Sequence, residues 1–229
     1  MLTGFRPTGP LHVGHWAGNV GNAVRLQDEG YECFYFVADW HMLTTHYDLT
    51  ESLPAAVEGL VLDLMASGID PSRSVVYRQS DLPEVAEMAL LLGMITPLGW
   101  LERVPTFKER LRDMAERDIA NLGLLGYPVL QTVDISIVRG ALVPVGEDQV
   151  SHLEISREIV RRFNRLYGDV LLEPQARPAR RMRRAEDLPI AFNPIALARF
   201  LRSTSLTSPR LQRSTGYEPN RTVLLRLSR

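Results

Sequence analysis

Cysteine and lysine are almost absent from this sequence of 229 residues. The single cysteine, Cys33, excludes an intramolecular disulfide and a metal centre built from several thiolates. It lies in the apolar run 32–38, which predicts a buried thiol. The single lysine, Lys108, leaves arginine and histidine as the sources of positive charge in the second half of the chain. Any site after residue 108 that requires a lysine ammonium group is therefore excluded.

Long apolar runs are also missing. No run reaches the roughly 18 to 20 residues that cross a bilayer, and the N-terminus has no basic segment followed by an apolar stretch. With 45% hydrophobic and 23% charged residues, the composition is that of a globular protein with a sizeable core. We therefore expect a cytoplasmic protein without a membrane partner.

The net charge of −1 conceals two oppositely charged parts. Residues 177–229 hold twelve arginines and three acidic residues, a net charge of +9, whereas the preceding residues carry −10. From about residue 174 the regular apolar spacing gives way to clusters of Pro, Arg, Ser and Thr. We predict a folded domain over 1–173 and a basic, divergent tail over 174–229, which either contacts a phosphate backbone or is solvated and disordered.

Apolar strands alternate with segments of helical length along the first three quarters of the chain. Strands are predicted at 2–5, 32–38, 74–78 and 141–145, and helices at 14–27, 53–65, 83–92, 107–118 and 149–167. This alternation predicts an α/β fold, a Rossmann-like parallel sheet with helices on both faces. Such folds bind ligands at the carboxyl ends of their strands, so we expect the chemistry there.

The turn after the first strand carries the sharpest motif. Residues 7–15 read PTGPLHVGH, with His12 and His15 three residues apart and Gly14 between them. A helix that begins here offers unpaired N–H groups to a phosphate, the glycine lets the ligand approach the backbone, and the histidines add donors. A His-x-x-His metal pair and ordinary capping by the histidines are the alternatives that these residues leave open.

Two further segments carry polar residues beside apolar ones. Residues 146–149 (GEDQ) follow a predicted strand and either cap the next helix or hold a ribose and an ammonium group. Tyr127, Gln131 and Asp134 have the spacing of one helix face. They either line a pocket or form an exposed stripe, and the spacing alone does not decide between the two.

Together these segments resemble the tryptophanyl-tRNA synthetases, a class I family, over about three quarters of the chain. The run 12–15 (HVGH) is similar to the His-Ile-Gly-His signature that binds ATP, and the segments 39–41 (DWH), 99–103 (GWLER) and 143–164 match in the same order. The resemblance implies a Rossmann-like catalytic domain that activates tryptophan with ATP and passes it to the 3′ end of tRNA. It also implies Mg²⁺ bound through the ATP phosphates, and a homodimer formed through the stretch 82–112.

The resemblance also assigns roles to individual residues. It implies His12 and His15 as the catalytic pair, and it assigns no protein ligand to a metal. The residues that it places around ATP are Arg6, Pro7, Thr8, Gly14, His15, Gly146, Glu147 and Asp148. The tryptophan pocket that it implies contains Asp134, which accepts the indole N–H, together with Tyr127, Gln149, His41, Gly4, Val143 and Val145.

The resemblance ends in the last quarter of the chain. Family members carry a Lys-Met-Ser-Lys-Ser loop whose lysines stabilise the leaving pyrophosphate, and the nearest counterpart here is 181–185 (RMRRA). No segment resembles the helical bundle that reads the anticodon. We therefore expect a truncated or divergent C-terminus and reduced or lost activity. The alternative interpretations are a non-catalytic protein that binds tryptophan, ATP or RNA, a tyrosyl-type synthetase, and a nucleotidyltransferase that shares the His-x-Gly-His turn.

Overall fold

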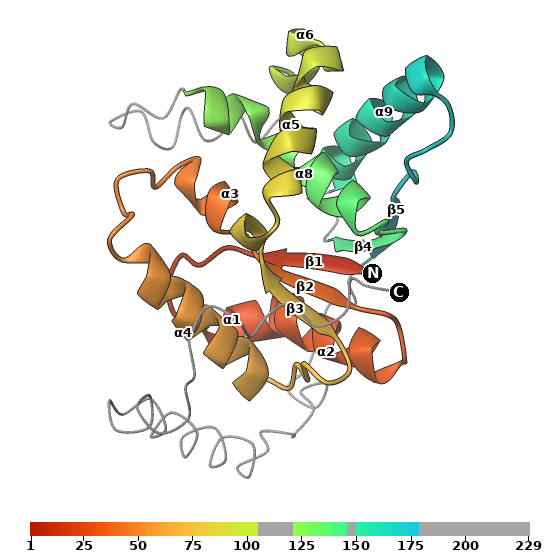
Figure 1. Cartoon of the computed structure of the whole chain (residues 1–229). Coiled ribbons are helices and arrows are strands. Elements are labelled where there is room, and N and C mark those ends of the chain that lie inside the picture. Colours follow the sequence, from red (N-terminus) through yellow and green to blue (C-terminus); the bar gives the residue numbers. More distant parts are fainter. Residues whose placement is uncertain (105–120, 146–149, 179–229) are drawn as a thin grey trace, which may run out of the picture.

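A three-stranded parallel sheet forms the centre of the fold (Figure 1). The computed structural model describes residues 1–104, 121–145 and 150–178. The strands β1 (Leu2–Phe5), β2 (Phe34–Val37) and β3 (Val75–Arg78) lie in the order β1-β2-β3. A second parallel pair, β4 (Leu142–Val145) with β5 (Gln175–Pro178), lies close to β1.

Helices connect successive strands. Between β1 and β2 the chain forms α1 (Val13–His15), the π-helical turn η1 (Trp16–Val20) and α2 (Gly21–Asp28). Between β2 and β3 it forms α3 (Asp39–Leu43) and α4 (Leu53–Ala66). The 3-10 turn η2 (Gln79–Asp81), α5 (Pro83–Ile95), α6 (Leu98–Leu101) and α8 (Leu122–Ile137) precede β4, and α9 (Val150–Tyr167) joins β4 to β5.

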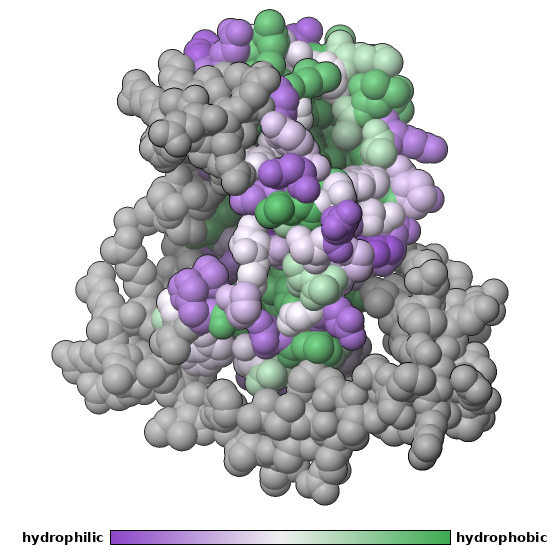
Figure 2. Space-filling model, turned by 90° about the vertical axis from the view of Figure 1, so that its left-hand side faces the viewer, coloured by the Kyte–Doolittle hydropathy of each residue, from purple (hydrophilic) through white to green (hydrophobic). Residues whose placement is uncertain are grey.

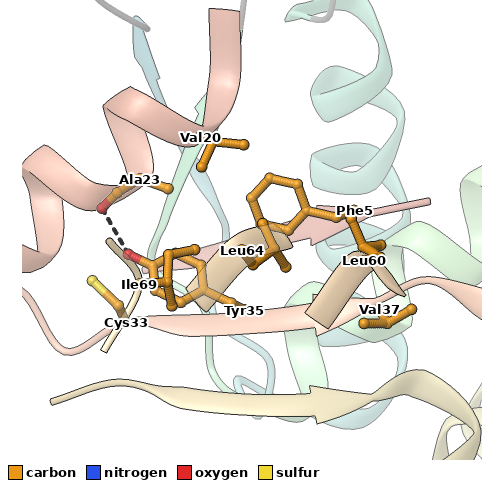
Figure 3. Close-up of a cluster of buried hydrophobic side chains, with 9 residues drawn as sticks. All are labelled: Phe5, Val20, Ala23, Cys33, Tyr35, Val37, Leu60, Leu64 and Ile69. Atoms are coloured by element: carbon orange, nitrogen blue, oxygen red, sulfur yellow. Dashed lines mark hydrogen bonds between the residues drawn. The ribbon is translucent and has the colours of Figure 1, made fainter. Parts of the chain in front are cut away.

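One face of the sheet packs against α2 and α4, and Figure 3 shows the side chains that meet there. Alternate strand residues supply this face because successive side chains of a strand point to opposite sides. The buried cluster consists of Phe5, Val20, Ala23, Cys33, Tyr35, Val37, Leu60, Leu64 and Ile69. Cys33 is among them, which confirms the buried thiol. The Tyr35 hydroxyl donates a hydrogen bond to the carbonyl of Ala23 at 2.7 Å, so α2 is tied to β2 (Figure 3).

The opposite face carries a second apolar cluster, formed with residues of α8, β4 and α9. Its members are Leu2, Phe36, Ala38, Tyr77, Ile135, Val143, Val145 and Leu153. Above it, α5, α8 and α9 pack on one another through a third cluster that includes Val85, Leu92, Val129, Val133 and Ile159. Helices therefore cover both faces of a parallel sheet, and the predicted α/β class is confirmed.

The predicted elements that fall in the described ranges are present, but no prediction covered α3, η2, α6 and α8. Two further differences concern the first helix and the tail. The helix expected at 14–27 contains the π-helical turn η1, a local insertion that is often found near functional sites. Residues 175–178, which the sequence placed in the basic tail, form β5 beside β4, so the folded body includes them. The helix expected at 107–118 and the tail from residue 179 lie outside the described residues. Within the described ranges, no helix is both long and apolar enough to cross a membrane.

Candidate nucleotide and amino-acid site

The candidate residues follow the strands at one edge of the sheet. The turn that contains His12 follows β1, His41 follows β2, and Gln79 follows β3. Because the three strands are parallel, their carboxyl ends lie at the same edge. The fold therefore brings together segments that are widely separated in the sequence.

His12 closes the turn that starts the first helix. Its Nδ1 atom accepts hydrogen bonds from the backbone nitrogens of Gly14, at 3.1 Å, and His15, at 3.3 Å. The neutral ring therefore carries its proton on Nε2, which can donate to a ligand. The rings of His12 and His15 stack with centroids 3.7 Å apart, and both residues are exposed. The turn thus presents histidine donors at a helix N-terminus, the geometry in which phosphates bind.

A buried carboxylate forms the second centre of the site. Asp134 is 2% exposed, on the face of α8 that points toward the sheet. Its Oδ2 atom lies 2.9 Å from His41 Nε2, and the side-chain amide of Gln79 donates to Oδ1 at 2.8 Å and to Oδ2 at 3.0 Å. Burial raises the pKa of Asp134, and the hydrogen bonds from His41 and Gln79 oppose that rise.

Sequence reasoning missed Gln79. This side chain is completely buried, and its Oε1 atom accepts from the backbone nitrogens of Trp40, at 3.1 Å, and His41, at 3.4 Å. The only feature of the sequence that could have indicated Gln79 is its position directly after a predicted strand. Polar residues at that position lie at the edge of a parallel sheet where ligands bind. Asp39 occupies the corresponding place after β2, where its carboxylate accepts from the backbone and hydroxyl of Ser80.

An apolar wall, the cluster that contains Tyr77, lies near the carboxylate: burial and then the nearby charge of Asp134 raise the pKa of Tyr77. Val143 and Val145 of β4 are buried in the same cluster as Phe36 and Tyr77. Gly4 faces Phe36 in the sheet register, and a Cβ atom on Gly4 would lie 2.5 Å from Phe36 Cζ. The Phe36 ring therefore occupies the space that any other residue at position 4 would fill.

The remaining predicted residues in the described ranges have contacts of their own. Tyr127 lies against His152, with its hydroxyl 3.4 Å from His152 Nε2 and the rings edge to face. The guanidinium group of Arg6 donates to Thr45 Oγ1 at 2.7 Å. Pro7 is buried and Thr8 is exposed on the turn. Tyr127 and Asp134 thus both make polar contacts, Tyr127 with α9 and Asp134 with α3 and η2.

Part of the predicted site lies outside the described residues. These positions are Gly146, Glu147, Asp148 and Gln149, and also the arginine segment 181–185. An open groove of about 840 Å³ lies between α3, α5 and α8, with Trp40, Ala89, Gly126 and Leu130 in its lining. None of the predicted site residues that the structure describes is in this lining, although Trp40 and Gly126 are the chain neighbours of His41 and Tyr127.

Comparison with known families decides what this arrangement is. Residues 1–185 match the family described as "tRNA synthetases class I (W and Y)". The chain belongs to this family of class I tRNA synthetases. The matched range covers β1 to β5, the histidine turn and Asp134, so the family assignment rests on the same segments that build the site.

Curated relatives within this synthetase family are tryptophan-tRNA ligases. The chain is 55% identical to the enzyme of Ralstonia nicotianae over 168 residues, which are 73% of this chain and 42% of the relative. It is 54% identical to the enzyme of Thermotoga maritima over 176 residues, 77% of this chain and 54% of the relative. The chain thus spans about half the length of the curated relatives that it matches.

Solved synthetase structures share the fold. Tryptophanyl-tRNA synthetase from Campylobacter jejuni, complexed with ADP and tryptophan, superposes with a TM-score of 0.72 at 37% identity, over 77% of this chain and 54% of that chain. A tyrosyl-tRNA synthetase from Archaeoglobus fulgidus gives a TM-score of 0.63 at 22% identity, over 77% of this chain and 53% of that chain. The second likeness shows the fold alone, whereas the first agrees with the tryptophan-specific relatives.

Proposed function

We propose that this chain activates tryptophan with ATP and passes the activated amino acid to tRNA, the reaction of a tryptophan-tRNA ligase. The observation that carries the proposal is the buried Asp134 carboxylate beside an apolar wall, at the edge of the sheet where the histidine turn lies. The Campylobacter jejuni relative, solved with ADP and tryptophan, supports both ligand classes. The reaction implies a cytoplasmic location.

The indole ring of tryptophan requires an acceptor in an otherwise apolar pocket. A carboxylate offers about four acceptor positions, and the described contacts to Asp134 use three of them. The indole N–H would donate to the fourth, with Gly4, Val143 and Val145 against the ring and Tyr127, His41 and Gln149 completing the pocket. A pocket that hydrogen-bonds its substrate rejects an analogue without the donor by roughly 10⁴ to 10⁵.

The histidine turn would hold the nucleotide. In the proposed reaction a carboxylate oxygen of tryptophan attacks the α-phosphorus, the bond from phosphorus to the bridging oxygen breaks, and pyrophosphate leaves. His12 donates through Nε2, and His15 lies against it, so both rings can stabilise the negative charge that develops on the phosphate oxygens. Arg6, Pro7, Thr8 and Gly14, with Gly146, Glu147 and Asp148, would complete the ATP site.

Mg²⁺ would neutralise phosphate charge when it is bound with ATP. In the described ranges no three His, Cys, Asp or Glu side chains gather in a group that could hold a metal ion. Magnesium usually binds through substrate phosphates and water with few protein ligands, so the described residues fit a metal that enters with the nucleotide.

The partners follow from the same proposal. tRNA would present its 3′ end to the activated tryptophan, and a second copy of the chain would pack on the helices α5 and α6. The exposed fractions of Leu90, Leu91, Met94 and Leu98 range from 58% to 72%. Figure 2 shows hydrophobic side chains at the upper end of the molecule, where α5 and α6 lie. Exposed apolar patches of this kind support an interface, within the predicted stretch 82–112.

Tryptophan-dependent exchange between ATP and pyrophosphate tests the proposal. The unmodified chain should catalyse exchange with tryptophan but not with tyrosine, at a rate reduced by the lack of lysine after residue 108. Asp134→Asn should lower this rate at least about 100-fold further, because the amide presents only one acceptor atom. Exchange with tyrosine would instead assign a tyrosyl-type enzyme. Tryptophan binding without exchange would support a non-catalytic binding protein, and absence of both would reject the proposed site.

A further inference from the structure

We propose that Gln79 is a positioning residue that fixes the Asp134 carboxylate and the His41 backbone for recognition of the indole N–H. This inference rests on the proposed function, because it concerns the same pocket. Gln79 itself need not contact tryptophan. Its effect would pass through the two groups that its side-chain amide holds.

The orientation of the Gln79 amide is determined from both sides. Its oxygen faces two backbone N–H donors, those of Trp40 and His41, and its nitrogen faces both carboxylate oxygens of Asp134. Rotating the amide by 180° would set nitrogen against donors and oxygen against the carboxylate, so every one of these contacts would become repulsive. The side chain is 0% exposed, so water cannot compensate.

This orientation keeps Asp134 in its acceptor form. Two donor atoms converge on the carboxylate: Gln79 Nε2 contacts both of its oxygens, and His41 Nε2 contacts Oδ2. A protonated Asp134 would present an O–H group to these donors and would retain less acceptor capacity for the indole N–H. Burial raises the pKa of Asp134, and without Gln79 one of the interactions that opposes this rise would be lost.

Gln79 also links the two elements that carry the pocket. Its amide oxygen holds the start of α3, where His41 lies, while its nitrogen holds α8 through Asp134. The hydrogen bond from His41 to the Asp134 carboxylate therefore also depends on Gln79, because Gln79 fixes the backbone from which the His41 side chain extends. Loss of Gln79 should weaken indole recognition more than loss of one hydrogen bond.

The chain contains a matched control for this glutamine. Gln27 is 3% exposed, donates to the carbonyl of Gly68 at 3.1 Å, and accepts from the Asp70 backbone and the Ser74 hydroxyl, both at 2.9 Å. It thus bridges buried polar groups as Gln79 does. It contacts the segment that precedes β3, however, which is the opposite edge of the sheet. Replacing either glutamine by methionine removes a similar set of hydrogen bonds at similar volume.

The test compares tryptophan with its benzothiophene analogue, in which sulfur replaces the indole N–H. Binding of each compound to the full chain is measured by calorimetry, and the ratio of the two dissociation constants reports the bond to Asp134. In Gln79→Met this ratio should fall about 10-fold or more, whereas in Gln27→Met it should stay within about two-fold. An unchanged ratio in Gln79→Met would overturn the inference.

Gln79→Asn covers a failure of Gln79→Met to fold. It keeps the amide donor and acceptor, but its side chain is one methylene group shorter and cannot bridge the backbone of Trp40 and His41 to Asp134. The ratio should fall here also, and a retained ratio would reject the proposed positioning role. If the unmodified chain binds tryptophan without preferring it to the analogue, the Asp134 assignment fails instead, which is a distinguishable result.

Discussion

The ring of His12 and the backbone of Gly14 are in direct contact at the start of the first helix. His12 Nδ1 accepts from the Gly14 nitrogen at 3.1 Å, and a Cβ atom on Gly14 would lie 2.9 Å from His12 Cε1. Real Cβ atoms essentially never approach another atom so closely. The glycine is therefore required for the histidine to sit over the helix N-terminus.

Gly14→Ala should impair nucleotide binding. The added methyl group displaces the His12 ring from its position over the turn, so a donor for the phosphate is misplaced. We expect the exchange rate to fall about 100-fold, with a smaller effect on tryptophan binding in the absence of ATP. Gly18→Ala is the matched control, because a Cβ atom at Gly18 has no neighbour within 4 Å among the described residues. Equal losses in both variants would contradict the argument.

Gly4→Ala should disturb the apolar wall of the pocket. The new methyl group would overlap the Phe36 ring, which is 5% exposed and stacked on Tyr77 with centroids 5.7 Å apart, so the ring has little room to move. We expect a loss of roughly 1–3 kcal/mol in the free energy of unfolding, measured with urea, and weaker tryptophan binding. Gly59→Ala, in α4 where a Cβ atom meets nothing within 4 Å, should leave both unchanged or slightly improve stability.

Two buried tyrosines should respond in opposite ways to loss of the hydroxyl group. Tyr35 donates to the carbonyl of Ala23, whereas the buried Tyr77 hydroxyl has no hydrogen-bond partner within the described residues. Tyr35→Phe should therefore cost about 1 kcal/mol in the free energy of unfolding. Tyr77→Phe should be neutral or stabilising, because it removes an uncompensated polar atom. A larger loss in Tyr77→Phe than in Tyr35→Phe would show that the Tyr77 hydroxyl has a partner.

The raised pKa of Asp134 should appear in the pH dependence of stability. The carboxyl has an ordinary pKa of 3.8 in the unfolded chain, and burial raises it in the folded protein. Between these two values the folded state binds more protons, so the contribution of Asp134 to stability falls as pH rises. The unfolding free energy of the unmodified chain, minus that of Asp134→Asn, should thus decrease as pH rises above 3.8. An increase over the same window would indicate a lowered pKa instead.

Much of the fold could be predicted from apolar spacing. The run 32–38 and the amphipathic segment 149–167 were expected as a strand and a helix, and they form β2 and α9. The strand, turn and helix around His12 could be placed for the same reason, since local sequence determines these elements. The π-helical turn η1 could not, because it depends on how the helix packs beneath the sheet.

The candidate site was only partly predictable. The spacing of Tyr127 and Asp134 indicated a common helix face but not whether that face was buried, because the residues that cover Asp134 lie in α3 and η2, far away in the sequence. Gln79 belongs to no motif, and its partner Asp134 lies 55 residues away. Tertiary contacts between residues so far apart leave no periodic pattern in the sequence. The family resemblance supplied the role of Asp134, but not the glutamine that holds it.

The pairing of β5 with β4 has a practical consequence for anyone who shortens this chain. β4 carries Val143 and Val145, and β5 (Gln175–Pro178) pairs with it as a parallel strand. The pairing satisfies the backbone hydrogen bonds along one edge of β4. A fragment that stopped at residue 173 would expose an apolar strand edge, and such edges recruit other chains into aggregates. Expressed fragments should therefore extend beyond Pro178, and poor solubility of shorter ones would reflect a missing strand and not a defective pocket.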